Sequence, residues 1–321
     1  MHSPLAPLPL GSGTVGGSVT VRVQTACVGF PSMTTTPVTV DAHSVAVVVP
    51  RSSFPGTRKF VRLLGASWQD ALQYRLEGAV WFLYDLLPPM GMLLLWLGAY
   101  RPGDTVAGYD VAGMVQYYLG VIALRTLLNP HPEWDIAEKI AKGTYGQVLL
   151  RPMSIVGFHL AGEVAWKVVR LLWLLPSMAV CIAVFWEYLQ APVVPPLHWV
   201  AFAMSIPLGY LTAFFLKMAM GYVAFWATNT EGIFVFMISL EMVFTGNFLP
   251  LQAMPDWVRM IGDWLPYRYF YFFSTQILRG TFTEVELAIG LLTQLGWVIG
   301  GYVVMRIVRT AGIRRYAAFG G

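Results

Sequence analysis

Charged side chains are scarce in this chain. Asp, Glu, Lys and Arg make up 12% of the 321 residues, whereas a soluble domain usually has about 25%. Cysteine is rarer still: Cys27 and Cys181 form no disulfide framework, and no Cys or His spacing suggests a metal site. Apolar residues, in contrast, make up 56% of the chain. The composition therefore predicts an integral membrane protein with several spans.

Sequence motifs for ATP binding and for catalysis are also missing. No G-x-x-x-x-G-K-[ST] loop occurs, so this chain is not expected to bind ATP itself. No G-x-S-x-G or H-E-x-x-H motif occurs, and the five histidines are scattered. An intramembrane enzyme is therefore the least favoured class of function. An ion-coupled secondary transporter that uses buried charges is a further alternative, although we see no internal repeat of span pairs, which such carriers often have.

The N-terminal region differs in composition from the rest. Residues 1–50 are rich in Gly, Ser, Thr, Pro and Val, which favours a disordered extension or an upstream start codon. A small ordered appendage built from VTVRVQTACV and HSVAVVV is the alternative. Within residues 51–78, Leu64 and Trp68 share one helical face and Asp70 lies on another. This pattern predicts an amphipathic interfacial helix on the cytoplasmic membrane surface.

The remaining residues, 79–321, contain six apolar segments of about 20 residues, the length that a bilayer span requires. They cover approximately 79–100, 109–128, 171–189, 198–227, 231–249 and 284–305. We therefore predict an all-α membrane protein with six transmembrane helices.

The distribution of Lys and Arg outside these segments predicts the topology. With both termini cytoplasmic, fifteen basic residues lie on the cytoplasmic side and four on the external side. The net charge of +4 is thus explained by topology, and no nucleic-acid partner is indicated.

The segment between the second and third predicted spans predicts a short cytoplasmic helix over 132–142. Pro132 suits the first helical position and Gly143 the end. The first turn holds Glu133 and Trp134, and one charged stripe follows at i, i+3, i+4 and i+7, formed by Asp135, Glu138, Lys139 and Lys142. Such a helix could dock a partner protein. A solvated loop helix without a partner is equally compatible with the spacing.

A second polar stripe lies on residues 155–170, a predicted extension of the third span. His159, Glu163 and Lys167 recur every fourth residue, and Arg170 adds a charge one turn later. Glu163 and Lys167 form a favourable i, i+4 pair, which contributes a few tenths of a kcal/mol when exposed. The pattern favours a solvated helix face.

Residues 244–280 combine three prolines with many aromatic residues: FTGNFLPLQAMPDWVRMIGDWLPYRYFYFFSTQILRG. A spanning helix would not hold so many prolines, and a water-exposed loop would not hold so many Trp, Tyr and Phe. The segment predicts an external re-entrant helical hairpin between the fifth and sixth spans.

Ionisable residues within the predicted spans are functional candidates by default. These are Asp85, Lys217 and Glu241, while Asp110 opens the second span at its exposed edge. Lys217 lies twelve residues before Asn229 and Glu241 twelve residues after it. An antiparallel helical hairpin places both at about the same depth. We predict an intramembrane ion pair, which orients the two helices more plausibly than it binds substrate.

The order of these parts resembles that of the type-2 ABC exporter permeases, in particular a bacterial subfamily of six-span permeases. The resemblance covers roughly residues 58–315. It rests on the LLRPMS element at 149–154 and on a pattern of small, proline and aromatic residues formed by Thr245, Gly246, Pro250, Leu251, Pro255 and Trp257.

The resemblance implies a permease subunit in the bacterial cytoplasmic membrane that pairs with a second copy or a paralogous permease. Separate ABC ATPase subunits would bind ATP and Mg²⁺. Residues 132–142 would be the coupling helix, with Glu133, Trp134, Asp135, Glu138, Lys139 and Lys142 at the ATPase. The hairpin would form the external gate, marked by Gly246, Pro250, Pro255, Trp257 and Pro266. The substrate class implied is amphipathic: a lipid, a glycolipid or a hydrophobic drug.

Overall fold

The computed structural model describes residues 75–151, 154–189, 194–227, 229–280 and 282–317, together with 19–20 and 39–40. The chain divides into two units, 1–53 and 54–321. In the first unit, β1 (Val19–Thr20) pairs antiparallel with β2 (Thr39–Val40). The predicted N-terminal extension otherwise lies outside the described residues. So does the predicted interfacial helix, except for its last four residues, which begin the first long helix.

The second unit is helical in its described residues, apart from a single β-bridge between Val106 and Tyr109. Its long helices are α2 (Arg75–Ala99), α3 (Val111–Leu128), α6 (Ile155–Val184), α7 (Pro196–Tyr222), α8 (Glu231–Phe244) and α11 (Glu284–Ala317). Short α-helices connect them: α4 (Pro132–Ala141), α5 (Tyr145–Leu149), α9 (Asp256–Trp264) and α10 (Phe272–Ile277). Single 3-10 turns are η1 (Trp186–Tyr188), η2 (Val223–Phe225), η3 (Leu251–Ala253) and η4 (Pro266–Tyr269).

Five helical stretches of the described chain are long and apolar enough to cross a membrane. They are Gly78–Ala99, Val111–Ala141, Ile155–Val184, Pro196–Phe225 and Glu284–Tyr316. The predicted fifth span, 231–249, instead holds α8, which has 14 residues. At 1.5 Å per residue such a helix is about 21 Å long, shorter than a hydrocarbon core of about 30 Å. The helix ends early because the backbone at Gly246 has a positive φ of 78°.

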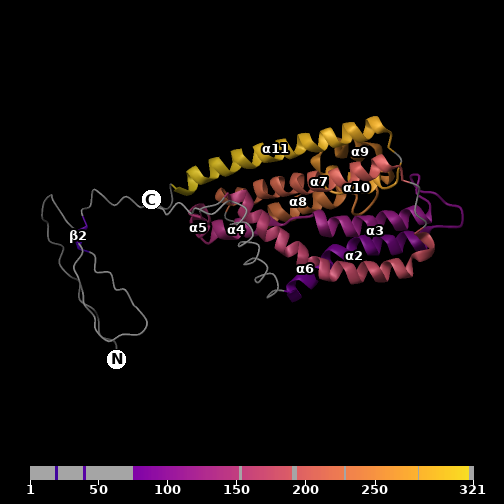
Figure 1. The fold of residues 1–321 in the computed structure, drawn as a ribbon, viewed down its shortest axis with the longest axis horizontal. Coiled ribbons are helices and arrows are strands. Elements are labelled where there is room, and N and C mark those ends of the chain that lie inside the picture. The colour runs from indigo at the N-terminus through magenta and orange to yellow at the C-terminus, as the bar shows by residue number, and fades with distance from the viewer. Residues whose placement is uncertain are drawn as a thin grey trace, which may run out of the picture. The chain divides into compact units, whose positions relative to one another are not determined.

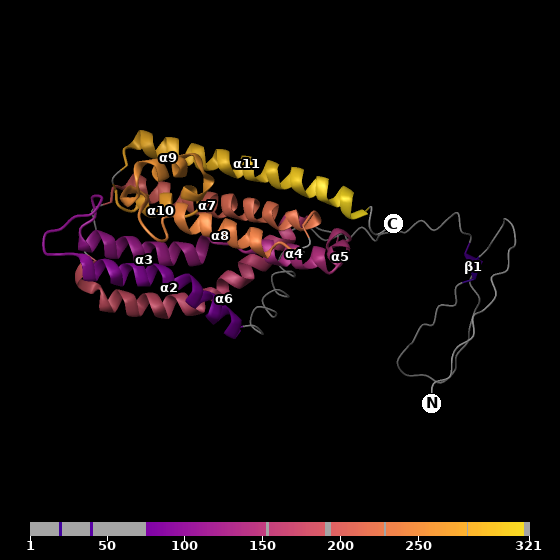
Figure 2. The same cartoon turned by 180° about the vertical axis from the view of Figure 1, so that it is seen from behind.

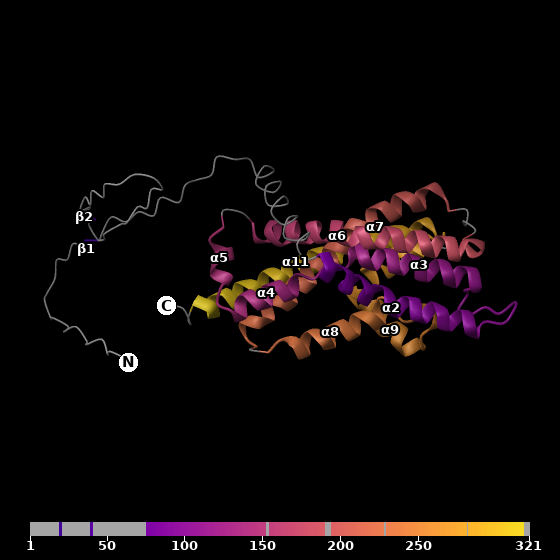
Figure 3. The same cartoon turned by 90° about the horizontal axis from the view of Figure 1, so that it is seen from below.

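The long helices form two groups around α3 (Figure 1). Helices α2, α3 and α6 contact one another, and α11 runs along α7. Helix α8 overlaps α7 in the view from behind (Figure 2), but the view from below shows it set apart from α7, on the side of α2 and α9 (Figure 3). The core is centred on α3, which buries Tyr117, Tyr118, Val121 and Ile122. Helices α2 and α11 instead expose many apolar side chains, as a lipid-facing helix does.

The short helices occupy the two ends of these groups (Figure 1). Helices α4 and α5 lie at one end, whereas α9 and α10 lie toward the other. The sequence-predicted helix over 132–142 is confirmed as α4, which starts at Pro132 and is capped at Lys142. Gly143 follows with a φ of 69°, as the predicted stop requires.

Candidate functional site

Helix α4 is fixed to the end of α7 by its apolar face. Ile136, Ala137 and Ile140 are buried. A Cβ atom added at Gly221 of α7 would lie 2.9 Å from the Cα of Glu133, so only glycine permits this approach. The first turn of α4 is therefore packed directly on α7 backbone.

The opposite face of α4 carries the exposed charges. Glu138 and Lys142 form an ion pair with 2.5 Å between Oε1 and Nζ, and their side chains are 60% and 67% exposed. Asp135 is paired with Lys139. Trp134 packs edge-on against Phe234 of α8, with ring centroids 4.9 Å apart. Glu133 differs from the other predicted coupling residues because its side chain is 0% exposed and faces His131.

The polar stripe on α6 turns inward, so the expectation of a solvated helix face is wrong. His159 Nδ1 lies 3.4 Å from Asp135 Oδ2 on α4, and the backbone N–H of His131 donates to Glu163 Oε1 at 3.1 Å. Lys167 Nζ donates to the carbonyl oxygens of Thr126 and Asn129. A polar stripe with this spacing occurs both on a solvated helix face and on a face that packs against other helices. The packing of α6 against the C-terminal end of α3 decides between them.

Asp85 is buried in α2 between two arginines. Its carboxylate lies 3.2 Å from Arg125 Nε of α3 and 2.8 Å from Arg170 Nη1 of α6. All three side chains are less than a tenth exposed. Such a buried carboxylate is stabilised by two cations, so Asp85 ties α2, α3 and α6 together. Asp85 was predicted as a functional candidate, whereas Arg125 and Arg170 were counted among the fifteen basic residues on the cytoplasmic side.

The predicted ion pair between Lys217 and Glu241 is confirmed. Lys217 Nζ lies 2.9 Å from Glu241 Oε2, and both side chains are buried. Lys217 also donates to the side-chain carbonyl of Asn129, which caps the C-terminus of α3. Asn129 was not among the predicted site residues, although an asparagine between an apolar helix and a proline is a recognisable end signal. Asn129 thus links α3 to the ion pair between α7 and α8.

The C-terminal end of α8 continues these contacts into the hairpin segment, residues 244–280. The Thr245 hydroxyl donates to the Glu241 carbonyl at 2.6 Å and shares a 2.6 Å hydrogen bond with the Tyr271 hydroxyl. Thr245 is fully buried, as is Tyr271. Hydrogen bonds therefore run from Asn129, beside α4, through Lys217 and Glu241 to the hairpin segment.

Two tyrosines of α3 hold the turn that follows Thr245. The Tyr117 hydroxyl donates to the Gly246 carbonyl at 2.5 Å, and the Tyr118 hydroxyl donates to the Phe248 carbonyl at 2.6 Å. A Cβ atom on Gly246 would lie 2.3 Å from the Tyr117 hydroxyl. The glycine of the motif is thus required by its φ and by this contact. Both tyrosines were missed because their partners are backbone atoms more than 120 residues away.

The three prolines of the hairpin segment each begin a helical turn. Pro250 precedes η3, Pro255 precedes α9, and Pro266 is the first residue of η4. Proline suits these positions because its fixed φ is helical and its missing N–H would have no intrahelical partner. The segment is thus a series of short helices, and the prolines set where each one starts.

The two halves of the hairpin segment differ in exposure. On α9, Trp257 and Trp264 are 67% and 81% exposed. In contrast, the residues from Tyr269 to Ile277 are buried without interruption, and Gln276 Nε2 donates to the Tyr109 hydroxyl at 2.7 Å. One half therefore offers an apolar surface, and the other half is part of the core.

These features define a helical membrane protein with a charged helix at one end and a proline-rich hairpin segment near the other. The family model for ABC-2 family transporter proteins matches residues 86–320. The chain belongs to this family. Searches of curated proteins and of solved structures gave no match.

Proposed function

We propose that this chain is the permease subunit of an ATP-driven exporter. It works as a dimer with a second copy or a paralogous permease, and separate ATPase subunits bind ATP and Mg²⁺. Membership of the ABC-2 transporter family supports the permease role. The exposed charged face of α4 supports the contact with an ATPase, because its apolar face is already packed on α7.

In this proposal the chain crosses the membrane six times and both termini are cytoplasmic. The fifth crossing combines α8 with the turn at Gly246 and the start of the hairpin segment. This arrangement puts α4 on the cytoplasmic side and α9 on the external side, as the distribution of Lys and Arg predicts. The separation of α4 and α9 toward the two ends of the long helices agrees with it (Figure 3).

The observation that carries the mechanism is the set of buried polar contacts between the two ends. Movement of α4 on the ATPase would displace α7 through the close contact at Gly221. Asn129, Lys217 and Glu241 would pass the displacement to Thr245, which is bonded to Tyr271 of the hairpin segment. Such a route requires an element of the structure that can adopt two conformations, and both ends must influence the balance between them. We propose that residues 244–280 are this element and act as the external gate.

An amphipathic substrate, such as a lipid, a glycolipid or a hydrophobic drug, suits this subunit. The ionisable residues predicted inside the spans are paired in the described part of the chain: Asp85 with Arg125 and Arg170, and Lys217 with Glu241. An ion-coupled carrier would need such charges to exchange partners during transport, whereas an ATP-driven permease needs them to hold the helices together.

The proposal is tested by exchanging the exposed charges of α4. The chain is co-expressed with a candidate ABC ATPase, and co-purification and substrate-stimulated ATPase activity are measured. The double variant Glu138→Lys with Lys142→Glu keeps an i, i+4 pair but reverses the charges that a partner meets. We expect association to weaken at least about tenfold, as for a charge pair across an interface.

The matched control exchanges the i, i+3 pair Asp256 and Arg259 on α9. This variant should retain the ATPase. Equal retention by both variants, together with transport that needs no ATPase, would favour an ion-coupled carrier and reject the exporter.

A further inference from the structure

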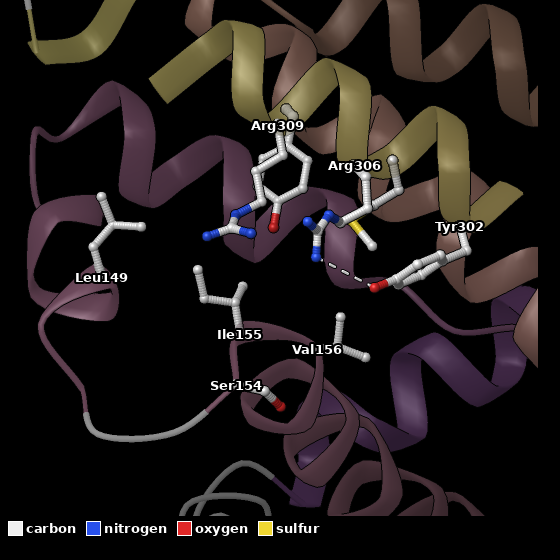
Figure 4. Close-up of a pocket in the computed structure, with 9 residues that line it drawn as sticks. Leu149, Ser154, Ile155, Val156, Tyr302, Arg306 and Arg309 are labelled. Atoms are coloured by element: carbon white, nitrogen blue, oxygen red, sulfur yellow. Dashed lines mark hydrogen bonds between the residues drawn. The ribbon is translucent and has the colours of Figure 1, made fainter. Parts of the chain in front are cut away.

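A cavity of about 470 Å³ lies between the C-terminal part of α11 and the start of α6 (Figure 4). Leu149 of α5 and Ser154 contribute to its walls. These two residues are the ends of the LLRPMS element, for which the transport mechanism gives no role. The cavity is open on one side and lies on the same end of the molecule as α4 and α5.

Two arginines of α11 supply the charge of the cavity. The guanidinium groups of Arg306 and Arg309 extend from α11 toward Ile155 and Val156 of α6 (Figure 4). Arg306 Nη1 lies 3.4 Å from the Tyr302 hydroxyl. The nine lining residues include no Asp or Glu. The cavity therefore carries a local positive charge of two, which a single acidic ligand would complement.

Arg309 has unused hydrogen-bonding capacity. Its buried Nε has no hydrogen-bond partner within the described part of the chain. The Arg309 guanidinium also interacts with Tyr145: burial raises the pKa of the Tyr145 phenol, while its hydrogen bond with Tyr222 and the charge and hydrogen bond of Arg309 oppose that rise. A buried N–H without an acceptor costs free energy, so an anion in the cavity that accepts from Arg309 Nε would remove this cost.

The first turn of α6 adds donors to the opposite wall. Ser154 is the N-cap residue, and its hydroxyl accepts from the Gly157 N–H at 3.0 Å. The remaining free N–H groups of this turn lie at the positive end of a 30-residue helix. Anions bind favourably at such an end when further cations face it.

The apolar part of the cavity indicates the kind of anion. Leu149, Ile155, Val156 and Met305 line it beside the charged groups. On the outer surface of α11, Val303, Val304 and Ile307 are exposed, so the apolar lipid-facing surface of α11 ends at the level of the two arginines. A ligand held here would place its charge at the membrane boundary and its apolar part along α11.

We propose that this cavity binds the anionic headgroup of a membrane phospholipid. The phosphate lies between Arg306 and Arg309, where bidentate guanidinium contacts suit its geometry. An acyl chain extends past Ile155 and Val156 into the bilayer. The bound lipid joins α11 to the start of α6, two helices that come from distant parts of the sequence.

The test uses the full chain in detergent and measures lipid retention by native mass spectrometry. The probes are phosphatidylglycerol, zwitterionic phosphatidylcholine and inorganic phosphate. We expect one phosphatidylglycerol to be retained per chain and phosphatidylcholine to be lost. The double variant Arg306→Gln with Arg309→Gln should retain phosphatidylglycerol about tenfold less well, because two charge-assisted contacts are removed.

The control variant is Arg314→Gln with Arg315→Gln, which removes the same charge from exposed positions of α11 outside the cavity. It should retain the lipid. The variant Arg306→Lys with Arg309→Lys keeps the charge. We expect it to retain an intermediate amount of phosphatidylglycerol, which would show that the glutamine variant loses the lipid through weaker binding and not through misfolding. Equal loss in the control variant, equal retention of phosphatidylcholine, or displacement of the lipid by millimolar inorganic phosphate would overturn the proposal. These outcomes do not depend on an ATPase, so they leave the exporter proposal untouched.

Discussion

Helices α4 and α9 are short amphipathic helices placed toward opposite ends of the same bundle, yet they expose opposite kinds of surface. Helix α4 buries its apolar face against α7 and exposes the ion pair of Glu138 and Lys142. Helix α9 buries little more than Gly262 and exposes Trp257 and Trp264. The exposed surface of α4 therefore suits water or a protein partner, whereas the exposed tryptophans of α9 suit lipid.

The way each helix is attached also differs. Helix α4 rests directly on α7 through Gly221. Helix α9 follows a turn that hydrogen bonds from Tyr117 and Tyr118 hold in place. The position of α4 therefore depends on close packing against α7, and that of α9 depends on a buried turn next to it. Substitutions at Gly221, beneath α4, and at Gly246, in the turn before α9, should therefore affect the two ends of the bundle separately.

The largest effect is expected at Gly246. The variant Gly246→Val places a β-branched residue at a φ of 78° and brings its Cβ into the Tyr117 hydroxyl. We expect a loss of at least about 4 kcal/mol in the free energy of unfolding, since strain and overpacking add. Thermal unfolding of the purified chain measures it. The control Gly91→Ala, where nothing lies within 4 Å of the added atom, should unfold at the wild-type temperature.

The ion pair of Lys217 and Glu241 lies between the two ends, and breaking it should have the next largest effect. The variant Lys217→Met leaves the buried Glu241 carboxylate without its cation, which should cost about 3 kcal/mol. The double variant Lys217→Met with Glu241→Leu should recover most of this stability. A double variant as unstable as the single one would contradict a simple pairing role. Denaturation in detergent distinguishes these outcomes.

A smaller effect, confined to the other end, is expected at Gly221. In the variant Gly221→Ala the methyl group would meet the Glu133 backbone, so α4 must shift away from α7. The cost should be about 2 kcal/mol, as for a moderate overpacking. Association with the ATPase should weaken, while the unfolding of the hairpin segment should not change. Gly232→Ala on α8, which has open space around it, is the control.

Cysteine labelling should separate the two surfaces with almost no effect on stability, below about 0.5 kcal/mol. In a background with Cys27 and Cys181 replaced, Glu138→Cys on α4 should react with a water-soluble maleimide in vesicles that expose this end. Met260→Cys, on the exposed apolar face of α9, should be protected in both vesicle orientations. The control Asp104→Cys, in the exposed loop between α2 and α3, should react from the side opposite to α4. Free reaction of Met260→Cys would show that α9 is in water.

Local patterns in the sequence were sufficient for the features that depend on neighbouring residues. Pro132 and Gly143 defined both ends of α4, and the apolar runs located the long helices, although α6 already begins at Ile155 and α11 continues to Ala317, beyond the predicted segments 171–189 and 284–305. The similar depth of Lys217 and Glu241 followed from their equal distance in sequence from Asn229, and the structure contains the ion pair. In each case a regular helical geometry converts residue spacing directly into position.

Features that depend on which helix packs against which could not be obtained this way. The stripe on α6 has the spacing of a solvated face, but α3 and α4 cover it. The spacing of α4 gives no sign that Glu133 is buried. The roles of Asn129, Tyr117 and Tyr118 depend on backbone atoms and side chains of distant segments.

The amino-acid order alone was enough to predict that this protein is helical, that it belongs in a membrane and that its helices break at defined prolines and glycines. These properties follow from hydropathy and from backbone conformational limits, which act within a few residues. Only the packing of the helices fixes that Asp85 pairs with Arg125 and Arg170, which face of each helix is buried, and that Arg306 and Arg309 face the start of α6 across a cavity. Those outcomes depend on contacts between helices far apart in the chain, and short-range spacing carries no information about such contacts.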